Sequence, residues 1–189
     1  NVNIEAKSGE VVGLLGPNGS GKTTLFNIIL GVVIPNKGKV LFNDKDITNM
    51  PIHKRARLGI TYLQQETSVF RELKVEENVK LVLEFQKLKK SEKEILIGDV
   101  LDEFGIKDLR KQYAFSLSGG EKRRLELARM MILRPQFVLL DEPFIGIDPK
   151  TVKEIQKIVI GLKEKGIGVI ITDHSVEALK TIVDRLYVI

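Results

Sequence analysis

The chain has 189 residues, of which 43% are hydrophobic and 29% are charged, and its net charge is +5. These proportions exclude a disordered chain and allow one domain with a substantial core. Basic and acidic residues are interspersed, so we expect no nucleic acid partner. The absence of Cys excludes disulfides and thiolate metal sites. No apolar run reaches the ~18 residues of a membrane-spanning helix.

Short apolar strands are predicted at intervals along the whole chain. In chain order they cover residues 1–6 (NVNIEA), 10–15 (EVVGLL), 38–44 (GKVLFND), 59–63 (GITYL), 137–140 (FVLL), 168–172 (GVIIT) and 185–189 (RLYVI). Brief apolar runs bounded by glycine or turn residues are typical of buried strands. Because strand-like segments stand at both chain ends, we expect most of a domain whose flanking residues are missing.

Helices are predicted between these strands, where apolar residues recur every three or four positions. They cover residues 22–30, 75–86 and 91–104, and two further stretches marked by the stripes Glu121, Leu125, Ala128, Ile132 and Val152, Ile155, Val159, Leu162. In the helix at 75–86, one side would carry Val75, Val79, Val82 and Gln86.

The order of these elements predicts an α/β fold with a mostly parallel sheet, because strands separated by helices run parallel with the helices on the sheet faces. Few strand signals occur between residues 67 and 134, which favours an inserted helical subdomain. We therefore expect a single domain over residues 1–189, with an α/β core from 1–66 and 135–189 and a helical subdomain from 67–134.

A glycine-rich segment, GPNGSGKTT, stands between the strand at 10–15 and the helix at 22–30. It fits the pattern G-x-x-x-x-G-K-[ST], whose glycines let the backbone wrap phosphate oxygens. The expected nucleotide-binding residues are Gly16, Pro17, Asn18, Gly19, Ser20, Gly21, Lys22, Thr23 and Thr24. Lys22 offers a cation to the β- and γ-phosphates, and Thr23 offers a hydroxyl to Mg²⁺. A plain glycine turn is the alternative, but the strand–loop–helix context favours a P-loop NTPase core.

Two acidic residues follow the apolar strand at 137–140. Asp141 stands at a strand end, where α/β sheets place ligands, and is expected to orient Mg²⁺. Glu142 would point the other way if the strand continued, and could polarise water for attack on the γ-phosphate. The alternative is that the pair caps the next helix. Gln64 and Gln65 follow the strand at 59–63, where an amide can ligate Mg²⁺ or position water.

Two histidines are present, and only one has a functional position. His174 follows the strand at 168–172, at the sheet edge expected for the P-loop. It is a candidate either to hydrogen-bond the γ-phosphate or to hold Glu142 in place. His53 is interpreted as a structural or surface histidine.

A second candidate anion site lies in the sequence FSLSGGEKRR. Ser118, Gly119, Gly120 and Glu121 begin a predicted helix, whose N-terminal N–H groups favour anions. This segment belongs to the helical insertion and cannot easily face the P-loop of its own chain. Two chains arranged head to tail would place each P-loop opposite the other chain's Ser118, which predicts a dimer that buries two nucleotides.

These motifs occur in an order that resembles the ATPase domain of ABC transporters over essentially the whole chain. The resemblance implies ATP and Mg²⁺ as cofactors, with Thr23, Gln65 and Asp141 at the metal. It further implies the following roles: Walker A for Gly16 to Thr24, Walker B for Asp141, catalytic glutamate for Glu142, signature motif for LSGGE from Leu117 to Glu121, Q-loop for Gln65, D-loop for Asp148 and switch histidine for His174.

Within that family, three longer segments resemble the ATP-binding subunits of lipopolysaccharide-export transporters. They are LGPNGSGKTTLFNIILG, RLGITYLQQETSVFREL and VIITDHSVEAL. The ATPases of branched-chain amino-acid importers are similar and remain an alternative. Gln64 stands where the closer relatives often have Pro, which leaves Gln65 as the better Q-loop candidate. The family's adenine-stacking aromatic lies upstream of this chain.

The sequence therefore predicts an ATP-hydrolysing subunit that closes as a homodimer and powers a membrane transporter. We expect it to be cytoplasmic and peripheral on the inner face of the cytoplasmic membrane, held there by transmembrane subunits. Phe70 is the candidate docking aromatic, and the alternative is that it packs within the helical subdomain. The basic stretches HKRAR and EKRR are interpreted as solvated faces.

Two rivals stay open. A soluble, non-transport ABC ATPase would usually carry two ATPase domains or long coiled coils. A nucleotide-binding module without turnover would not need the pair of Asp141 and Glu142.

Overall fold

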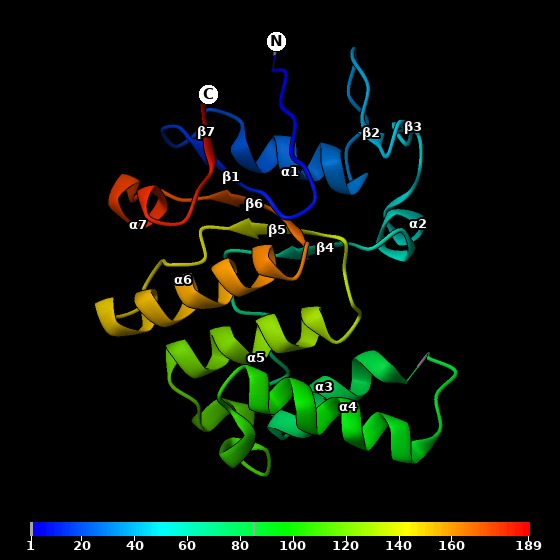
Figure 1. The fold of residues 1–189 in the computed structure, drawn as a ribbon, viewed down its shortest axis with the longest axis vertical. Helices are drawn as coiled ribbons and strands as arrows, with labels where there is room; N and C mark the ends of the chain where they lie inside the picture. Colours follow the sequence, from blue (N-terminus) through cyan, green and yellow to red (C-terminus); the bar gives the residue numbers. More distant parts are fainter. Residues whose placement is uncertain (1, 85) are drawn as a thin grey trace.

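A parallel sheet organises the molecule. The computed structural model describes residues 2–84 and 86–189, and its main sheet has five parallel strands in the order β4-β5-β6-β1-β7 (Figure 1). The strands are β1 (Val11–Leu15), β4 (Ile60–Leu63), β5 (Phe137–Asp141), β6 (Gly168–Thr172) and β7 (Arg185–Val188). The predicted α/β fold is confirmed.

Seven α-helices are described around this sheet. They are α1 (Lys22–Leu30), α2 (Ile52–Arg57), α3 (Val75–Leu83), α4 (Lys90–Glu103), α5 (Gly119–Met131), α6 (Pro149–Glu164) and α7 (Val176–Lys180). Short 3₁₀ turns occupy Lys107–Leu109 and Ala114–Ser116. Helices α2 and α7 are absent from the sequence-based prediction, because both are too short to show a clear helical period. In the described part of the chain, each helix is too short or too polar to cross a membrane.

One predicted strand is wrong, and another is shorter than expected. Residues 2–7 form no strand, and Asn1 lies outside the described residues. The stretch at 38–44 becomes part of a small antiparallel hairpin, β2 (Leu41–Phe42) and β3 (Lys45–Asp46). The reason is local, since Asn43 and Asp44 adopt left-handed conformations with φ of 49° and 61° and reverse the chain.

The helix predicted at residues 75–86 is shorter than expected. It ends at Leu83, Gln86 is exposed, and Phe85 lies outside the described residues. Its buried face includes Asn78, which the sequence analysis left out. Asn78 is buried because its side-chain amide donates to the carbonyl of Phe70, 3.0 Å away, and so ties the preceding loop to the helix.

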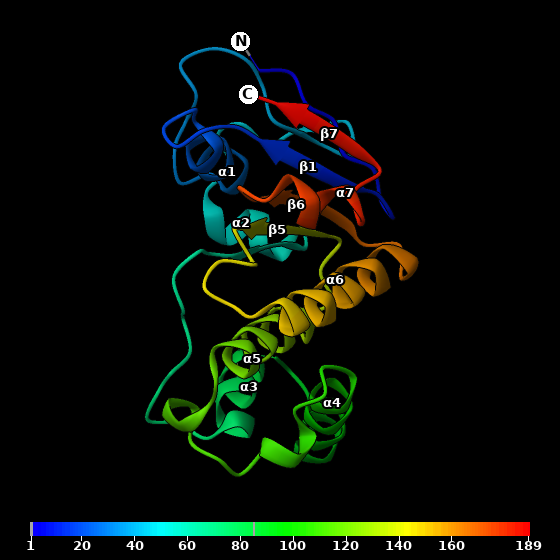
Figure 2. The same ribbon diagram turned by 90° about the vertical axis from the view of Figure 1, so that its left-hand side faces the viewer.

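Alternate residues of the strands face opposite layers of the molecule. Leu139 of β5 and Ile170 of β6 pack with Phe26 of α1. Their neighbours Leu140 and Ile171 pack in the larger core, toward α5 and α6. Figure 2 shows the result, with β5 and β6 lying between α1 and α6.

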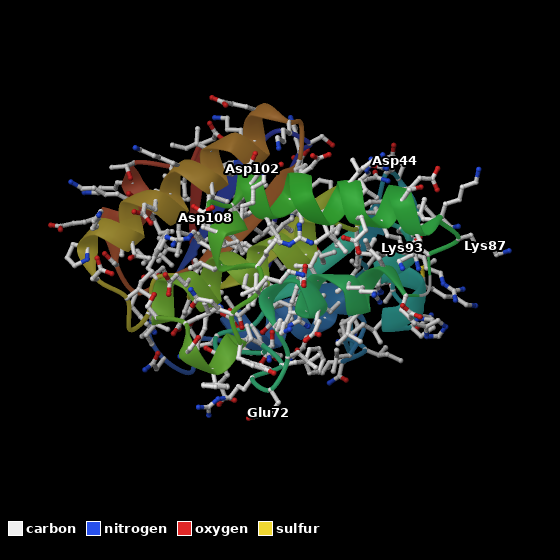
Figure 3. All side chains as sticks on the ribbon, turned by 90° about the horizontal axis from the view of Figure 1, so that it is seen from below. Asp44, Glu72, Lys87, Lys93, Asp102 and Asp108 are labelled. Atoms are coloured by element: carbon white, nitrogen blue, oxygen red, sulfur yellow. The ribbon has the colours of Figure 1, made fainter. Side chains whose placement is uncertain are left out.

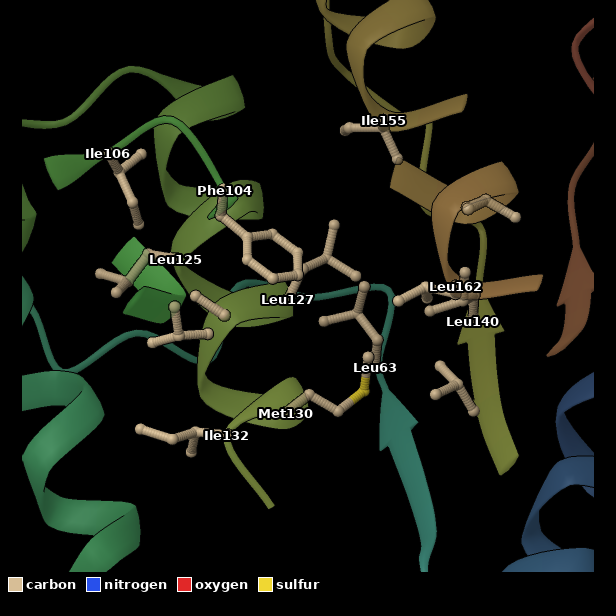
Figure 4. Close-up of a cluster of buried hydrophobic side chains, with 14 of the residues drawn as sticks. Leu63, Phe104, Ile106, Leu125, Leu127, Met130, Ile132, Leu140, Ile155 and Leu162 are labelled. Atoms are coloured by element: carbon tan, nitrogen blue, oxygen red, sulfur yellow. The ribbon is translucent and has the colours of Figure 1, made fainter. Parts of the chain in front are cut away.

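The helices α3, α4 and α5 lie beyond α6, at the end of the molecule away from β7 (Figure 1). They are joined to the sheet by one continuous core, shown in Figure 4. In it, Leu127 and Met130 of α5 gather with Leu63 of β4 and Leu140 of β5. Helix α5 therefore packs its apolar side chains against both the sheet and the other helices of the helical part.

The outer surface of the helical part carries charges of both signs. Seen from that end, Glu72 projects at the lower rim of the molecule, and Lys93, Asp102 and Asp108 lie over the face turned toward the viewer (Figure 3). Ion pairs tie part of this surface together, such as the Arg110 guanidinium on the Glu76 carboxylate at 2.5 Å.

The interpretation of both basic stretches as solvated faces is wrong for one arginine in each. Arg55 and Arg123 have exposed fractions of 1% and 6%. Sequence could not reveal this, because an arginine is buried only when enough acceptors converge on it.

Arg55 finds those acceptors at the end of α1. Its guanidinium donates to the carbonyls of Ile28 and Ile29, each at 2.7 Å, and to those of Met50 and Thr48 at 2.7 and 2.8 Å. The last carbonyls of a helix lack partners within it, so a cation there satisfies them and interacts well with the helix dipole. Arg55 thus fixes the helix that follows the glycine-rich loop.

We predict that Arg55→Ala lowers the free energy of unfolding by about 3 kcal/mol, because several buried carbonyls lose their donor at once. Urea denaturation measures this change. Arg57→Ala, on the exposed side of the same helix, should change it by less than about 0.5 kcal/mol. Equal effects of the two substitutions would contradict the capping role of Arg55.

Candidate nucleotide-binding site

The carboxyl ends of four adjacent strands place the predicted site residues together. The glycine-rich loop follows β1, Gln65 follows β4, Glu142 follows β5 and His174 follows β6. Parallel strands all end at the same edge of the sheet, so residues far apart in sequence meet there. The structure brings these residues together at this edge.

They line a cavity of about 550 Å³, a size suited to a small-molecule ligand. Its lining residues are Asn18, Gly19, Gly21, Lys22, Thr23, Thr24, Gln65, Glu142, Ile145 and His174. Gln65 is therefore the glutamine at the cavity. Gln64 instead offers its backbone carbonyl to Arg123, 2.9 Å away.

The glycine-rich loop is shaped by two backbone requirements. Gly21 immediately precedes α1 with φ of 103°, a conformation that side chains with a Cβ rarely adopt. A Cβ on Gly16 would lie 2.4 Å from the carbonyl oxygen of Ile189, so the loop is packed closely against the end of β7. By contrast, Gly19 faces open space, which leaves its backbone approachable from the cavity.

Lys22 is almost fully buried in this loop, with an exposed fraction of 6%. Its ammonium donates to the carbonyls of Gly16 and Pro17, at 2.6 and 2.9 Å. The loop thus holds a cation at its centre, and the hydroxyl of Ser20 is buried nearby without a hydrogen-bond partner. Such a loop suits an anion with several oxygen atoms.

Asp141 is held by three hydroxyl groups. Thr172 donates to its Oδ1 at 2.6 Å, Tyr62 donates to its Oδ2 at 3.1 Å, and Thr23 Oγ1 lies 3.4 Å from that same Oδ2. Burial, together with the Asp141 carboxylate, raises the pKa of Tyr62 well above its usual value, so the phenol remains a donor. Tyr62 and Thr172 are functional-site residues that were not predicted, although both stand on strands next to β5.

Glu142 departs from the expected strand geometry. The strand ends at Asp141, and Glu142 adopts φ of 46°, a left-handed conformation that is unusual for a residue with a side chain. The prediction that it would point away along a continuing strand is therefore wrong. Its N–H donates to the carbonyl and the hydroxyl of Thr172, at 3.0 and 3.1 Å, and this turn directs the carboxylate into the cavity.

His174 contacts the Glu142 carboxylate directly, with Nε2 2.6 Å from Oε1. Of the two roles considered for His174, this contact favours holding Glu142 in place. The second oxygen, Oε2, is buried without a hydrogen-bond partner. The alternative that Asp141 and Glu142 cap the next helix is wrong, because α6 is capped by Asp148, which accepts from the Lys150 and Thr151 N–H groups.

The oxygen atoms in this cavity fit a hard divalent cation. Thr23 and Asp141 present a hydroxyl and a carboxylate 3.4 Å apart, and the side chain of Gln65 lines the same cavity. Mg²⁺ takes such oxygen ligands, usually a few from the protein together with substrate phosphates.

The segment around Ser118 lies outside this cavity, as predicted for a single chain. Ser118 caps α5, accepting from the Glu121 N–H at 3.3 Å, while its own N–H and hydroxyl donate to the Glu121 carboxylate at 2.7 and 2.8 Å. These two donors lower the pKa of Glu121, so its charge persists. A Cβ on Gly120 would lie 2.5 Å from Thr151 Cγ2, which packs this helix start against α6.

The ABC transporter family model matches residues 1–145, most of the chain. This chain belongs to the ABC transporter family of ATP-binding subunits. The cavity at the glycine-rich loop is consistent with the nucleotide site that this family implies. The chain is therefore an ATPase subunit of this family.

Several curated relatives match over the whole chain. An uncharacterised ABC transporter ATP-binding protein of Rhizobium meliloti is 50% identical over 188 residues, which make up 100% of this chain and 70% of that protein. The lipopolysaccharide export system ATP-binding protein LptB of Escherichia coli is 45% identical over 189 residues, or 100% of this chain and 78% of that protein.

Solved structures agree with the fold. An ATP-binding cassette of an ABC transporter in its ADP conformation matches with a TM-score of 0.88 and 30% identity, covering 100% of this chain and 79% of that one. The protein cbiO1 of Clostridium perfringens, part of the transporter complex cbiONQ, matches with a TM-score of 0.92 and 31% identity, covering 99% of this chain and 76% of that one.

Proposed function

We propose that two copies of this chain close head to tail around two ATP molecules and that hydrolysis reopens them. One observation carries this proposal: the cavity gathers Lys22, Thr23 and Glu142, whereas the helix start at Ser118 lies outside it. A second chain is needed to bring that helix start to the γ-phosphate. The segment from Ser118 to Gly120 would then supply N–H groups and a hydroxyl to the far side of the nucleotide.

Within each cavity, the residues divide the work of phosphoryl transfer to water. Lys22 would bind the β- and γ-phosphates, and the backbone from Gly16 to Gly21 would surround them. Mg²⁺, held by Thr23, Gln65 and Asp141, would neutralise the charge that develops on these phosphates. Glu142 would accept the proton of the attacking water, and His174 would orient that carboxylate.

We predict that Glu142→Gln loses roughly 10²–10⁴-fold in turnover, the usual contribution of a general base. ATP binding should persist, because Lys22, Thr23 and Asp141 are unchanged. The variant should accumulate as an ATP-filled dimer that rarely reopens. Phosphate release and solution mass, measured with ATP and Mg²⁺ on one sample, test this. Normal turnover would remove Glu142 from the mechanism, and slow turnover with a monomeric mass would contradict the closed dimer.

We predict that Ser118→Arg abolishes ATP-driven dimerisation and leaves ATP binding by the monomer largely intact. The reason is geometric, since a bulky side chain at the start of α5 blocks approach to the partner's phosphate. Ser91→Arg, at an exposed position in the first turn of α4, is the matched control. Size-exclusion chromatography with ATP and Mg²⁺ separates the outcomes, and an unaltered dimer of the Ser118 variant would refute the arrangement.

We infer further that this subunit powers lipopolysaccharide export from the inner face of the cytoplasmic membrane. This inference is based on the similarity to LptB proteins. The LptB of Escherichia coli is 45% identical over the whole chain. A branched-chain amino-acid importer and a soluble, non-transport ATPase are the alternatives. Transmembrane subunits would dock at Phe70, whose side chain is 48% exposed, so packing within the helical subdomain is incomplete.

We predict that the tagged full-length protein, purified from its native membrane, brings transmembrane subunits and lipopolysaccharide with it. Phe70→Ala should lose both, because the docking aromatic is gone, while keeping ATP-driven dimerisation. Ile95→Ala removes a more exposed apolar residue, 63% exposed on α4, and should lose neither. Membrane subunits that arrive with a hydrophobic amino acid and without lipopolysaccharide would favour the importer.

A further inference from the structure

One face of α5 carries a row of charged residues that belong to neither the cavity nor the helix start. Arg123, Glu126 and Arg129 follow one another at intervals of three, so they lie along the same side of the helix. Arg123 and Glu126 are 6% and 3% exposed. Charges so deeply buried are tolerated only where each finds partners, so the partners of this row identify what it holds.

At one end of the row, Arg123 holds the turn that directs Glu142. Its Nη2 donates to the carbonyls of Asp141 and Glu142, at 3.3 and 3.5 Å, and its Nε donates to the carbonyl of Pro143 at 3.3 Å. Through Nη1 the same guanidinium reaches the carbonyl of Gln64, at 2.9 Å. One side chain therefore bridges the turn after β5 and the loop that carries Gln65.

This turn needs such support. A residue with a side chain is strained at φ of 46°, and strained backbone persists only where its surroundings determine it. The N–H of Glu142 is fixed by Thr172, and the carbonyl side of the turn is fixed by Arg123. Loss of either support would let Glu142 relax away from the cavity.

At the other end of the row, Glu126 and Arg129 hold the segment at Ser68 and Phe70. Glu126 Oε2 pairs with Arg123 Nη1 at 3.0 Å, while its Oε1 accepts from the N–H and the hydroxyl of Ser68. Arg129 Nη1 donates to the carbonyl of Ser68 at 2.7 Å, and its guanidinium lies 4.9 Å from the centre of the Phe70 ring. Both polar groups of the Ser68 backbone are thus bonded to α5.

We propose that Arg123 is a positioning residue for Glu142, and that Arg123, Glu126 and Arg129 form the link through which the Ser68–Phe70 segment controls it. Movement of Ser68 withdraws a donor from buried Glu126, and the Glu126 carboxylate is the charge that balances Arg123. The contacts of Arg123 with the turn then change as well, because buried charged networks respond as a unit. This proposal rests on the proposed roles of Glu142 and Phe70.

The first test is Arg123→Lys in the full-length protein. Lysine keeps the charge beside Glu126 but cannot reach the turn and Gln64 together, because it lacks the guanidinium fork. The kcat for ATP hydrolysis, normalised to nucleotide-binding sites, should fall roughly tenfold to a hundredfold, while KM for ATP stays within about twofold. Amide hydrogen exchange at residues 142–146 should quicken. The matched control, Arg110→Lys, removes a fork that donates to Glu76 and Glu94, and should leave kcat and this exchange unchanged.

The second test is a double-mutant cycle on kcat. Arg129→Lys weakens the contacts with Ser68 and Phe70 and should lower kcat although it is remote from the cavity. In a Glu126→Gln background, the link is already broken, so adding Arg129→Lys should lower kcat no further. If Glu126→Gln does not fold, Glu126→Asp replaces it, because the shorter carboxylate cannot reach Arg123 and Ser68 together.

Several outcomes would overturn the proposal. An unchanged kcat for Arg123→Lys, or a lower thermal stability with normal kcat per binding site, would leave Arg123 with a purely structural role. Fully additive effects of Glu126 and Arg129 substitutions would disprove the link. The turnover of Glu142→Gln distinguishes failure of the proposed function from failure of this inference. Normal turnover of Glu142→Gln would overturn the proposed function itself. Slow turnover of Glu142→Gln together with normal turnover of Arg123→Lys would overturn only the inference about Arg123.

Discussion

The common direction of the five strands is the constraint on which the rest of this molecule depends. Because β4, β5, β6 and β1 end at one edge, four unrelated loops deliver their polar residues to a single cavity. Hydrogen bonds between neighbouring strand ends also hold the cavity residues in place. Thr172, the last residue of β6, donates to the carboxylate of Asp141 and accepts from the N–H of Glu142, so neighbouring strands fix one another's functional ends.

The helix α5 is the second organising element, and its faces have different tasks. Its first residue follows Ser118, which caps it, and its apolar side reaches both the sheet and the helical part. A third face buries Arg123 and Glu126, whose contacts run to the turns around the cavity. Burial of charge is costly unless every group is satisfied, so this face tolerates little sliding of the helix along its axis.

Much of this arrangement could be predicted from sequence, since the strands after which site residues stand are short apolar runs and the glycine-rich loop has a specific pattern. The failures share a cause. The hairpin at Asn43 and Asp44, the left-handed turn at Glu142 and the burial of Arg55 are decided by backbone conformations or by acceptors from distant segments. None of these leaves a periodic signal. Tyr62 was missed for the same reason, because its hydroxyl matters only through its distance from Asp141.

The carbonyl contacts of Lys22 have a consequence for ligand entry. The ammonium is already seated at the centre of a folded loop, so an arriving phosphate meets a receptor whose charge and shape exist beforehand. Under the proposed function, little chain entropy would be lost on binding, and the main event would be an exchange of neutral carbonyl oxygens for charged phosphate oxygens around one cation. Any compact oxyanion can make that exchange. Under the proposed function, discrimination among mono-, di- and triphosphates would depend on how far the remaining oxygens extend toward Thr23, Asp141 and His174, and therefore on the length of the phosphate chain.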